Sequence, residues 1–129
     1  MSVDPNVINF RKIELIKRKN AYLELIGKHP NSIPVIVGRI DKKCPTISKF
    51  KFITSKTISF GELAIKIRNR IPNLRSDDAL YFFISDNILM MPHVTVGQLY
   101  DRYKDVNDGF LYITYGVESV FGDDNILNS

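Results

Sequence analysis

Apolar positions along the chain follow strand patterns in five segments. These are residues 33–37, 49–54, 80–84, 88–90 and 108–115. The last segment, which continues toward residue 120, is rich in Phe, Tyr, Ile and Thr, and it is largely apolar on both faces. A strand with two apolar faces must be covered on both sides, so we expect this one in the middle of the sheet. Residues 33–37 show the same pattern and predict a second inner strand.

Residues 49–54 alternate instead. Lys49, Lys51 and Ile53 share one face, and Phe50, Phe52 and Thr54 share the other. Lysines along one face are typical of a strand at the edge of a sheet, so we expect this strand there.

Two capping boxes mark helix starts. Ser59 with Glu62 precedes apolar residues at helical spacing, namely Phe60, Leu63, Ala64, Ile67 and Ile71, and Pro72 ends the pattern. Thr95 with Gln98 precedes a shorter helix that carries Val96, Leu99, Tyr100 and Tyr103 on one face. The first of these is the main helix that the sequence predicts.

The N-terminal segment predicts two further helical pieces. Asp4 and Pro5 suit a helix start, and two competing apolar phases within residues 7–27 indicate a break before an end at Gly27. The segment is basic. Its lysines and arginines are interpreted as a solvated helix face, with an acidic lipid or protein surface as the alternative partner.

The order of these elements predicts an α+β fold of the ubiquitin-like β-grasp type with an N-terminal helical extension. One mixed sheet would wrap over the helix that starts at Ser59, and the last strand would lie parallel to the first in mid-sheet. We expect residues 1–28 to form the extension and residues 29–122 the β-grasp domain.

The composition is that of a globular protein, and it indicates the compartment and the kind of partner. The chain has 129 residues, an ordinary hydrophobic fraction of 44%, and no apolar run long enough to cross a bilayer. Cys44 is its one cysteine, so no internal disulfide can form, and we expect an intracellular, reducing compartment. Residues 1–72 hold 15 Lys/Arg and 5 Asp/Glu, whereas residues 73–129 hold 3 and 9. The basic first half indicates an acidic partner.

The sequence shows only weak signs of the residue patterns that are typical of metal sites and catalytic nucleophiles. Two histidines and one cysteine do not suit an ordinary zinc site, and no pattern supplies Cys44 with a base. Asp77 and Asp78 are interpreted as closing a turn. We therefore expect no enzyme activity, no metal and no cofactor.

Several short strings occur in an order that resembles the autophagy ubiquitin-like modifiers, the family of the GABA-receptor-associated protein and the microtubule-associated light chains. The strings are Ile33–Val37, Ile67–Ile71, Asp78–Phe83, Val96–Tyr100, Asp108–Tyr112 and Glu118–Gly122. The resemblance covers most of residues 30–122 and implies the same β-grasp fold with two N-terminal helices.

The resemblance also implies a mechanism centred on Gly122. A processing cysteine protease would cut between Gly122 and Asp123 and remove the tail of residues 123–129, leaving Phe121 just before the new end. Activating and conjugating enzymes would then pass the Gly122 carboxylate to phosphatidylethanolamine. The implied location is cytoplasmic, as a monomer in solution, with a lipidated pool on autophagosome membranes.

A second implied activity is the binding of cargo receptors and adaptors through short aromatic-x-x-aliphatic motifs, which would add as a strand to residues 49–54. The implied aromatic pocket comprises Leu25, Pro34, Ile36, Lys51, Ile53 and Phe110. The implied aliphatic pocket comprises Phe52, Thr54, Ile58, Leu63 and Arg70. Lys49, Lys51 and Arg70 would attract acidic residues that flank the motif. Burial in the β-grasp core is the alternative interpretation of Ile36, Leu63 and Phe110.

Three other functions are consistent with parts of the sequence. A related modifier that joins to a protein lysine would be expected to end at its glycine, so the tail argues against it. An unconjugated β-grasp peptide-interaction module would keep the tail. A basic RNA-binding domain would use exposed aromatic residues for stacking, but no recognised RNA motif is present, and we expect no nucleic-acid partner.

Overall fold

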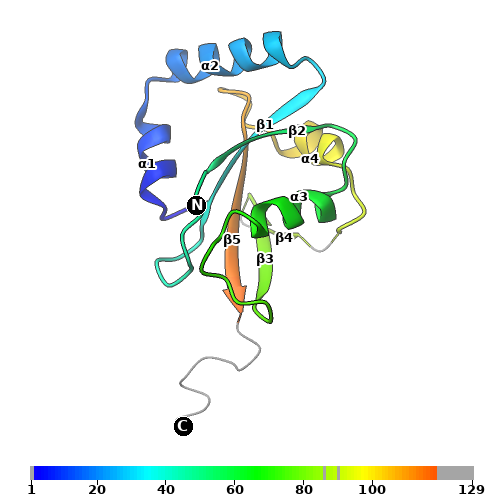
Figure 1. The fold of residues 1–129 in the computed structure, drawn as a ribbon. Helices are drawn as coiled ribbons and strands as arrows, with labels where there is room; N and C mark the ends of the chain where they lie inside the picture. The colour runs from blue at the N-terminus through cyan, green and yellow to red at the C-terminus, as the bar shows by residue number, and fades with distance from the viewer. Residues whose placement is uncertain (1, 86, 90, 119–129) are drawn as a thin grey trace.

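A computed structural model describes residues 2–85, 87–89 and 91–118 of the chain (Figure 1). The described elements are, in order, α1 (Pro5–Lys12), α2 (Leu15–Lys28), β1 (Ser32–Arg39), β2 (Lys51–Ser55), α3 (Phe60–Arg68), β3 (Ala79–Ile84), β4 (Asn87–Leu89), α4 (Val96–Tyr103) and β5 (Leu111–Glu118). The α+β β-grasp arrangement predicted from the sequence is confirmed.

The strands form one mixed sheet in the order β2-β1-β5-β3-β4. β5 lies in its middle, parallel to β1 with Val35 opposite Leu111, and antiparallel to β3 with Phe82 opposite Tyr115. β2 lies at one edge and pairs with β1 alone among the described strands. The predicted central position of the last strand and the predicted edge position of the lysine-rich strand are both confirmed.

The main core lies between one face of the sheet and α3. Leu111, Ile113 and Tyr115 point from β5 into this core and are at most 1% exposed, and Leu63 and Ile67 of α3 meet them there fully buried. Tyr112 and Thr114 point to the opposite face of the sheet and are half-buried, because alternate residues of a strand point to opposite sides.

A smaller core on the other face of the sheet holds the N-terminal helices. Val7 and Phe10 of α1 pack with Ile36 of β1 and with Phe110, which directly precedes β5. The Phe10 and Phe110 rings meet edge to face with their centroids 5.1 Å apart. Phe10 is thus the main apolar anchor of α1 on the sheet.

Several boundaries differ from the predictions, and for two of them the hydrogen bonds show why. β2 begins at Lys51: Phe50 still accepts from the Val37 N–H of β1, but the Ser48 N–H donates to the Arg70 carbonyl, so the chain has left the sheet and Lys49 lies outside the strand. α3 ends at Arg68, short of Pro72. Ile71 is buried all the same, because tight i→i−3 turns after the helix carry it back to the core.

The helix starts follow their capping residues. At Thr95 both halves of the predicted capping box form. At Ser59 only the forward half forms as predicted: its Oγ accepts from the Glu62 N–H, whereas the Glu62 carboxylate reaches the Ser59 hydroxyl at 3.5 Å. The predicted break in the N-terminal helix is confirmed at Ile13 and Glu14, which separate α1 from α2, and α2 ends at Lys28.

Candidate functional site

On its outer side the edge strand β2 pairs with no other described strand, and the Arg70 side chain bonds there to the Lys51 carbonyl. The Val37 N–H donates to the Phe50 carbonyl, so the backbone of Phe50 faces β1. Because backbone groups alternate in direction along an antiparallel strand, Lys51 and Ile53 present their N–H and C=O groups outward. An extended peptide can add to such an edge as a further strand.

A small depression beside this edge contains part of the implied aromatic pocket. Leu25, Pro34 and Ile53 line it, together with Ile26, His29 and Ser32, which the sequence analysis did not single out. Those three belong to the end of α2 and the start of β1. Their position next to Leu25 and Pro34 in sequence was the signal that could have found them.

The other three residues of the implied aromatic pocket do not line the depression. Ile36 and Phe110 are buried in the smaller core, against which Leu25 packs. Lys51 is exposed above them, with its Nζ 5.0 Å from the centroid of the Phe10 ring and 5.5 Å from that of Phe50. The depression therefore brings together Leu25, Pro34 and Ile53, whereas Ile36, Phe110 and Lys51 lie outside its lining.

The implied aliphatic pocket lies further along β2. Phe52, Thr54 and Leu63 are buried in the described structure, and Ile58 is half-buried. The Arg70 guanidinium covers Phe52 at 3.8 Å from the ring centroid, and its Nη1 donates to the outward Lys51 carbonyl at 3.0 Å. An aliphatic ligand side chain would reach this place only if the Arg70 side chain moved aside.

Thr54 has an unusual environment within this group. Its side chain is buried in the sheet, and its Oγ1 has no hydrogen-bond partner among the described residues. A buried hydroxyl without a partner costs stability, because it has lost its hydrogen bonds to water. The strand pattern of the sequence predicted that Thr54 faces inward, but it could not show that the hydroxyl lacks a partner.

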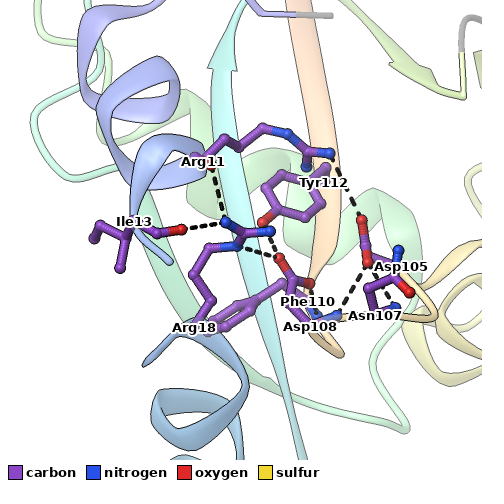
Figure 2. A network of polar contacts seen from close by, with 8 residues as sticks. All are labelled: Arg11, Ile13, Arg18, Asp105, Asn107, Asp108, Phe110 and Tyr112. Carbon is purple, nitrogen blue, oxygen red and sulfur yellow. Dashed lines mark hydrogen bonds and ion pairs between the residues drawn. The ribbon is translucent and has the colours of Figure 1, made fainter. Parts of the chain in front are cut away.

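A buried ion pair between Arg18 and Asp108 links α2 to the loop before β5 (Figure 2). Asp108 is fully buried, and its Oδ2 accepts from the Arg18 Nε at 3.0 Å. The same oxygen accepts from the Tyr112 hydroxyl, and Oδ1 accepts from the Phe110 N–H at 2.9 Å. Arg18 also donates from Nη1 to the carbonyls of Arg11 and Ile13, the last turn of α1 and the link to α2.

The network continues from α1 to the loop before β5. Arg11 pairs with Asp105 at 3.6 Å, and its guanidinium lies 4.1 Å from the centroid of the Tyr112 ring (Figure 2). Burial raises the pKa of Tyr112 above its ordinary value of 10.0, and the bond to Asp108 acts in the same direction. The two helices are therefore held to the sheet by charge as well as by Phe10.

Tyr22 of α2 adds a third attachment to the same loop. Its ring packs edge to face on Phe110, with the centroids 6.2 Å apart. It also lies so close to Gly109 that a Cβ on that residue would meet the ring at 2.7 Å, and Gly109 has a φ of +85°. Glycine is required at position 109 by both its backbone conformation and this close approach.

The described residues offer little for catalysis. No group of three or more His, Cys, Asp or Glu side chains that could hold a metal ion occurs among them. Cys44 is buried, and burial raises the pKa of its thiol above the ordinary 9.0, which disfavours the reactive thiolate. Within the same residues, every helix is too short or too polar to cross a bilayer.

Gly122 and Phe121 lie outside the described residues. β5 carries the chain to Glu118, the last residue that the structure describes, at the end of the sheet opposite α2 (Figure 1).

Comparisons with known proteins agree with this architecture. The family model described as "Autophagy protein Atg8 ubiquitin like" matches residues 17–122. Autophagy-related protein 8 of Dictyostelium discoideum is 35% identical over 111 residues, which cover 85% of this chain and 89% of that protein. The crystal structure of Trypanosoma brucei ATG8 superposes with a TM-score of 0.77 at 25% identity, covering 87% of this chain and 95% of that one.

Proposed function

Because the chain belongs to the Atg8 family of ubiquitin-like autophagy proteins, we propose that it is a modifier joined through Gly122 to phosphatidylethanolamine. The observation that carries the proposal is the family match, which covers most of α2 and all strands of the described sheet and ends at Gly122. A processing cysteine protease would release residues 123–129. Activating and conjugating enzymes would then transfer the Gly122 acyl group to the lipid amine. The chain acts in this scheme as the modifier, not as an enzyme.

The physical basis for the anchor is the lipid itself. Each buried CH₂ contributes about 0.8 kcal/mol to membrane binding, so one acyl chain binds only marginally, whereas the two chains of a phospholipid hold a protein stably. A cytoplasmic pool and a lipid-bound pool on autophagosome membranes follow from this proposal.

Replacing Gly122 with Ala tests the proposal. A Cβ at this position should block both cleavage and transfer, so cells that express Gly122→Ala should contain only the full-length, unconjugated chain. Gly27→Ala is the matched control, because a Cβ at Gly27 meets no atom within 4 Å. A lipidated form of Gly122→Ala, detected by a gel shift and by its mass, would refute the assignment of Gly122.

We also propose that β2 and the depression beside it bind aromatic-x-x-aliphatic motifs of cargo receptors and adaptors. Three features support this: the free edge of β2, the apolar lining from Leu25, Pro34 and Ile53, and the cations Lys49, Lys51 and Arg70 nearby. The peptide strand would bond to the outward groups of Lys51 and Ile53. Acidic residues flanking the motif would face the cations.

Lys51→Ala should weaken binding of an acidic-flanked peptide by about two- to fivefold, since an exposed charge pair contributes up to about 1 kcal/mol. The salt dependence of binding should flatten at the same time. The matched control is Lys66→Ala, an exposed lysine on α3. Equal affinities of wild type and Lys51→Ala at low salt, measured by calorimetry, would exclude Lys51 from the site.

An unconjugated peptide-interaction module is the second candidate. The edge strand β2 and the depression beside it would bind peptides in the same way in either candidate, so they support both equally. Comparing the wild-type chain with Gly122→Ala in cells separates the two, because only a conjugated modifier gives a wild-type chain whose mass differs from that of the full-length protein.

A further inference from the structure

An open cavity of about 320 Å³ lies on the face of the sheet opposite α3. Its walls come from α1, from the strands β1, β3 and β5, and from the end of α4 with the loop that follows it. Its volume is at the lower end of the range for small-molecule sites. No described residue lines both this cavity and the depression beside β2, so the two are separate places on the molecule.

The lining of the cavity is rich in aromatic side chains. Phe83 of β3, Tyr103 of α4 and Tyr112 of β5 all contribute to it, and all three are half-buried. Val7 and Ile36, which belong to the smaller core, add aliphatic surface. Aromatic rings pack well on one another edge to face or offset, so this lining suits a ligand with an aromatic body.

The Arg11 guanidinium provides a place for a negative charge at this cavity (Figure 2). It lies 4.1 Å from the centroid of the Tyr112 ring and pairs with Asp105 at 3.6 Å. That distance is longer than the about 2.7–2.9 Å of a strong charge-assisted hydrogen bond. Because a guanidinium carries several N–H donors in a planar fork, Arg11 can donate to a ligand carboxylate while it stays on the Tyr112 ring.

The charges around the cavity favour a ligand with a single negative charge. Arg11 and Lys104 are cationic and Asp105 is anionic, which leaves a balance of +1. One carboxylate matches this balance, whereas Asp105 would repel the second charge of a phosphate dianion. Thr114 and Tyr103 add hydroxyl groups to the lining, which can orient a polar group of the ligand.

We propose that this cavity binds a small aromatic carboxylic acid in its ionised form. The aromatic body of the ligand packs among Phe83, Tyr103 and Tyr112, and its carboxylate accepts hydrogen bonds from the Arg11 guanidinium. The proposal goes beyond the proposed function and does not depend on it, because neither Gly122 nor β2 takes part.

The first test titrates the full, unconjugated chain with naphthylacetate and follows the backbone amide signals by NMR. Shifts should concentrate at Phe83, Tyr103 and Thr114 and leave Leu25 and Ile53 at the depression unchanged. A dissociation constant of about 1 mM or tighter is expected for a ligand of this size. Naphthylacetamide, which has the same ring but no charge, should bind about tenfold more weakly. Shifts centred on β2, no shifts at millimolar ligand, or equal affinities for the acid and the amide would overturn the proposal.

The second test changes the charges at the cavity in both directions. Arg11→Gln should weaken binding of naphthylacetate about tenfold, and Arg11→Lys should recover part of the loss, since it keeps the charge but not the fork. Asp105→Asn should strengthen binding about two- to fivefold, because a competing charge is removed while an acceptor oxygen remains for the N–H groups of Asn107 and Asp108. Lys66→Gln, which removes an exposed charge on α3, is the matched control and should bind like wild type. Unchanged affinity of Arg11→Gln, or weaker binding by Asp105→Asn, would refute the proposal.

A third variant fills the cavity and leaves every charge in place. Thr114→Ile adds apolar bulk at a half-buried position of β5, where a β-branched residue suits the strand. It should weaken binding of naphthylacetate at least tenfold while the amide spectrum stays that of a folded chain. Thr57→Ile makes the same change at an exposed position and should bind like wild type. A folded Thr114→Ile chain that binds the acid as wild type does would show that the ligand lies elsewhere.

Discussion

Removing the Arg18 side chain tests whether the buried ion pair holds the N-terminal helices to the sheet. Arg18→Met keeps most of the length of the side chain but leaves Asp108, which is fully buried, without its cation. It also removes the donor to the carbonyls of Arg11 and Ile13 at the junction of α1 and α2.

The expected loss follows from the geometry. Breaking a buried ion pair by removing one partner costs about 3–5 kcal/mol, because the remaining charge stays buried. The lower end applies here, since the Tyr112 hydroxyl and the Phe110 N–H still donate to Asp108. We expect a loss of about 3 kcal/mol in the free energy of unfolding, which lowers the Tm of a chain of this size by roughly 10 °C.

Urea unfolding at neutral pH measures this loss, and amide hydrogen exchange locates it. Exchange should accelerate in α1 and α2 and stay slow in β5, because the clamp joins the helices to the sheet. Arg18→Met/Asp108→Asn should recover about half of the loss, since an amide carries no charge to leave unpaired. Lys19→Met, one residue along on the exposed side, should change stability by less than about 0.5 kcal/mol. A loss below about 1 kcal/mol, or no recovery in the double variant, would refute this account of the clamp.

Two further predictions concern buried polar groups. Thr54→Val should stabilise the protein by about 1 kcal/mol in urea unfolding, because it removes a buried hydroxyl that lacks a partner among the described residues. The exposed Thr57→Val is its control, and a destabilised Thr54→Val would show that the hydroxyl has a partner after all. Burial raises the pKa of Tyr100, Tyr112 and Tyr115 above 10.0, so the stability these tyrosines contribute is complete below that pH and declines above it. Phenolate absorbance should appear at higher pH in the folded chain than in urea, and coincident titrations would contradict the assignment.

Most of the fold could be predicted because its signals are local or periodic. The two-sided apolar pattern of residues 110–115 predicted the central strand, and the lysines of residues 49–54 predicted the edge. The end of α3 and the start of β2 were misplaced, because tertiary contacts set both. Ser48 bonds to Arg70, and tight turns carry Ile71 to the core after the helix has ended.

Less of the candidate site could be predicted from the sequence. The face shared by Lys51 and Ile53 follows from strand alternation, and both residues lie on the exposed side of β2. Ile26, His29 and Ser32 join Leu25 at the depression because the end of α2 meets the start of β1 there, although their nearness to Leu25 and Pro34 in the sequence was a weak signal. The partnership of Arg18 with Asp108 joins residues 90 positions apart, which no local pattern reveals.

The central claim is conjugation through Gly122, and the intact mass of the chain from its own cells tests it most directly. Soluble and membrane fractions should be compared under starvation. The account predicts loss of residues 123–129, with a phospholipid-sized increment in the membrane fraction. A full-length, unmodified chain in both fractions would contradict it and would leave the unconjugated peptide-interaction module as the function to pursue.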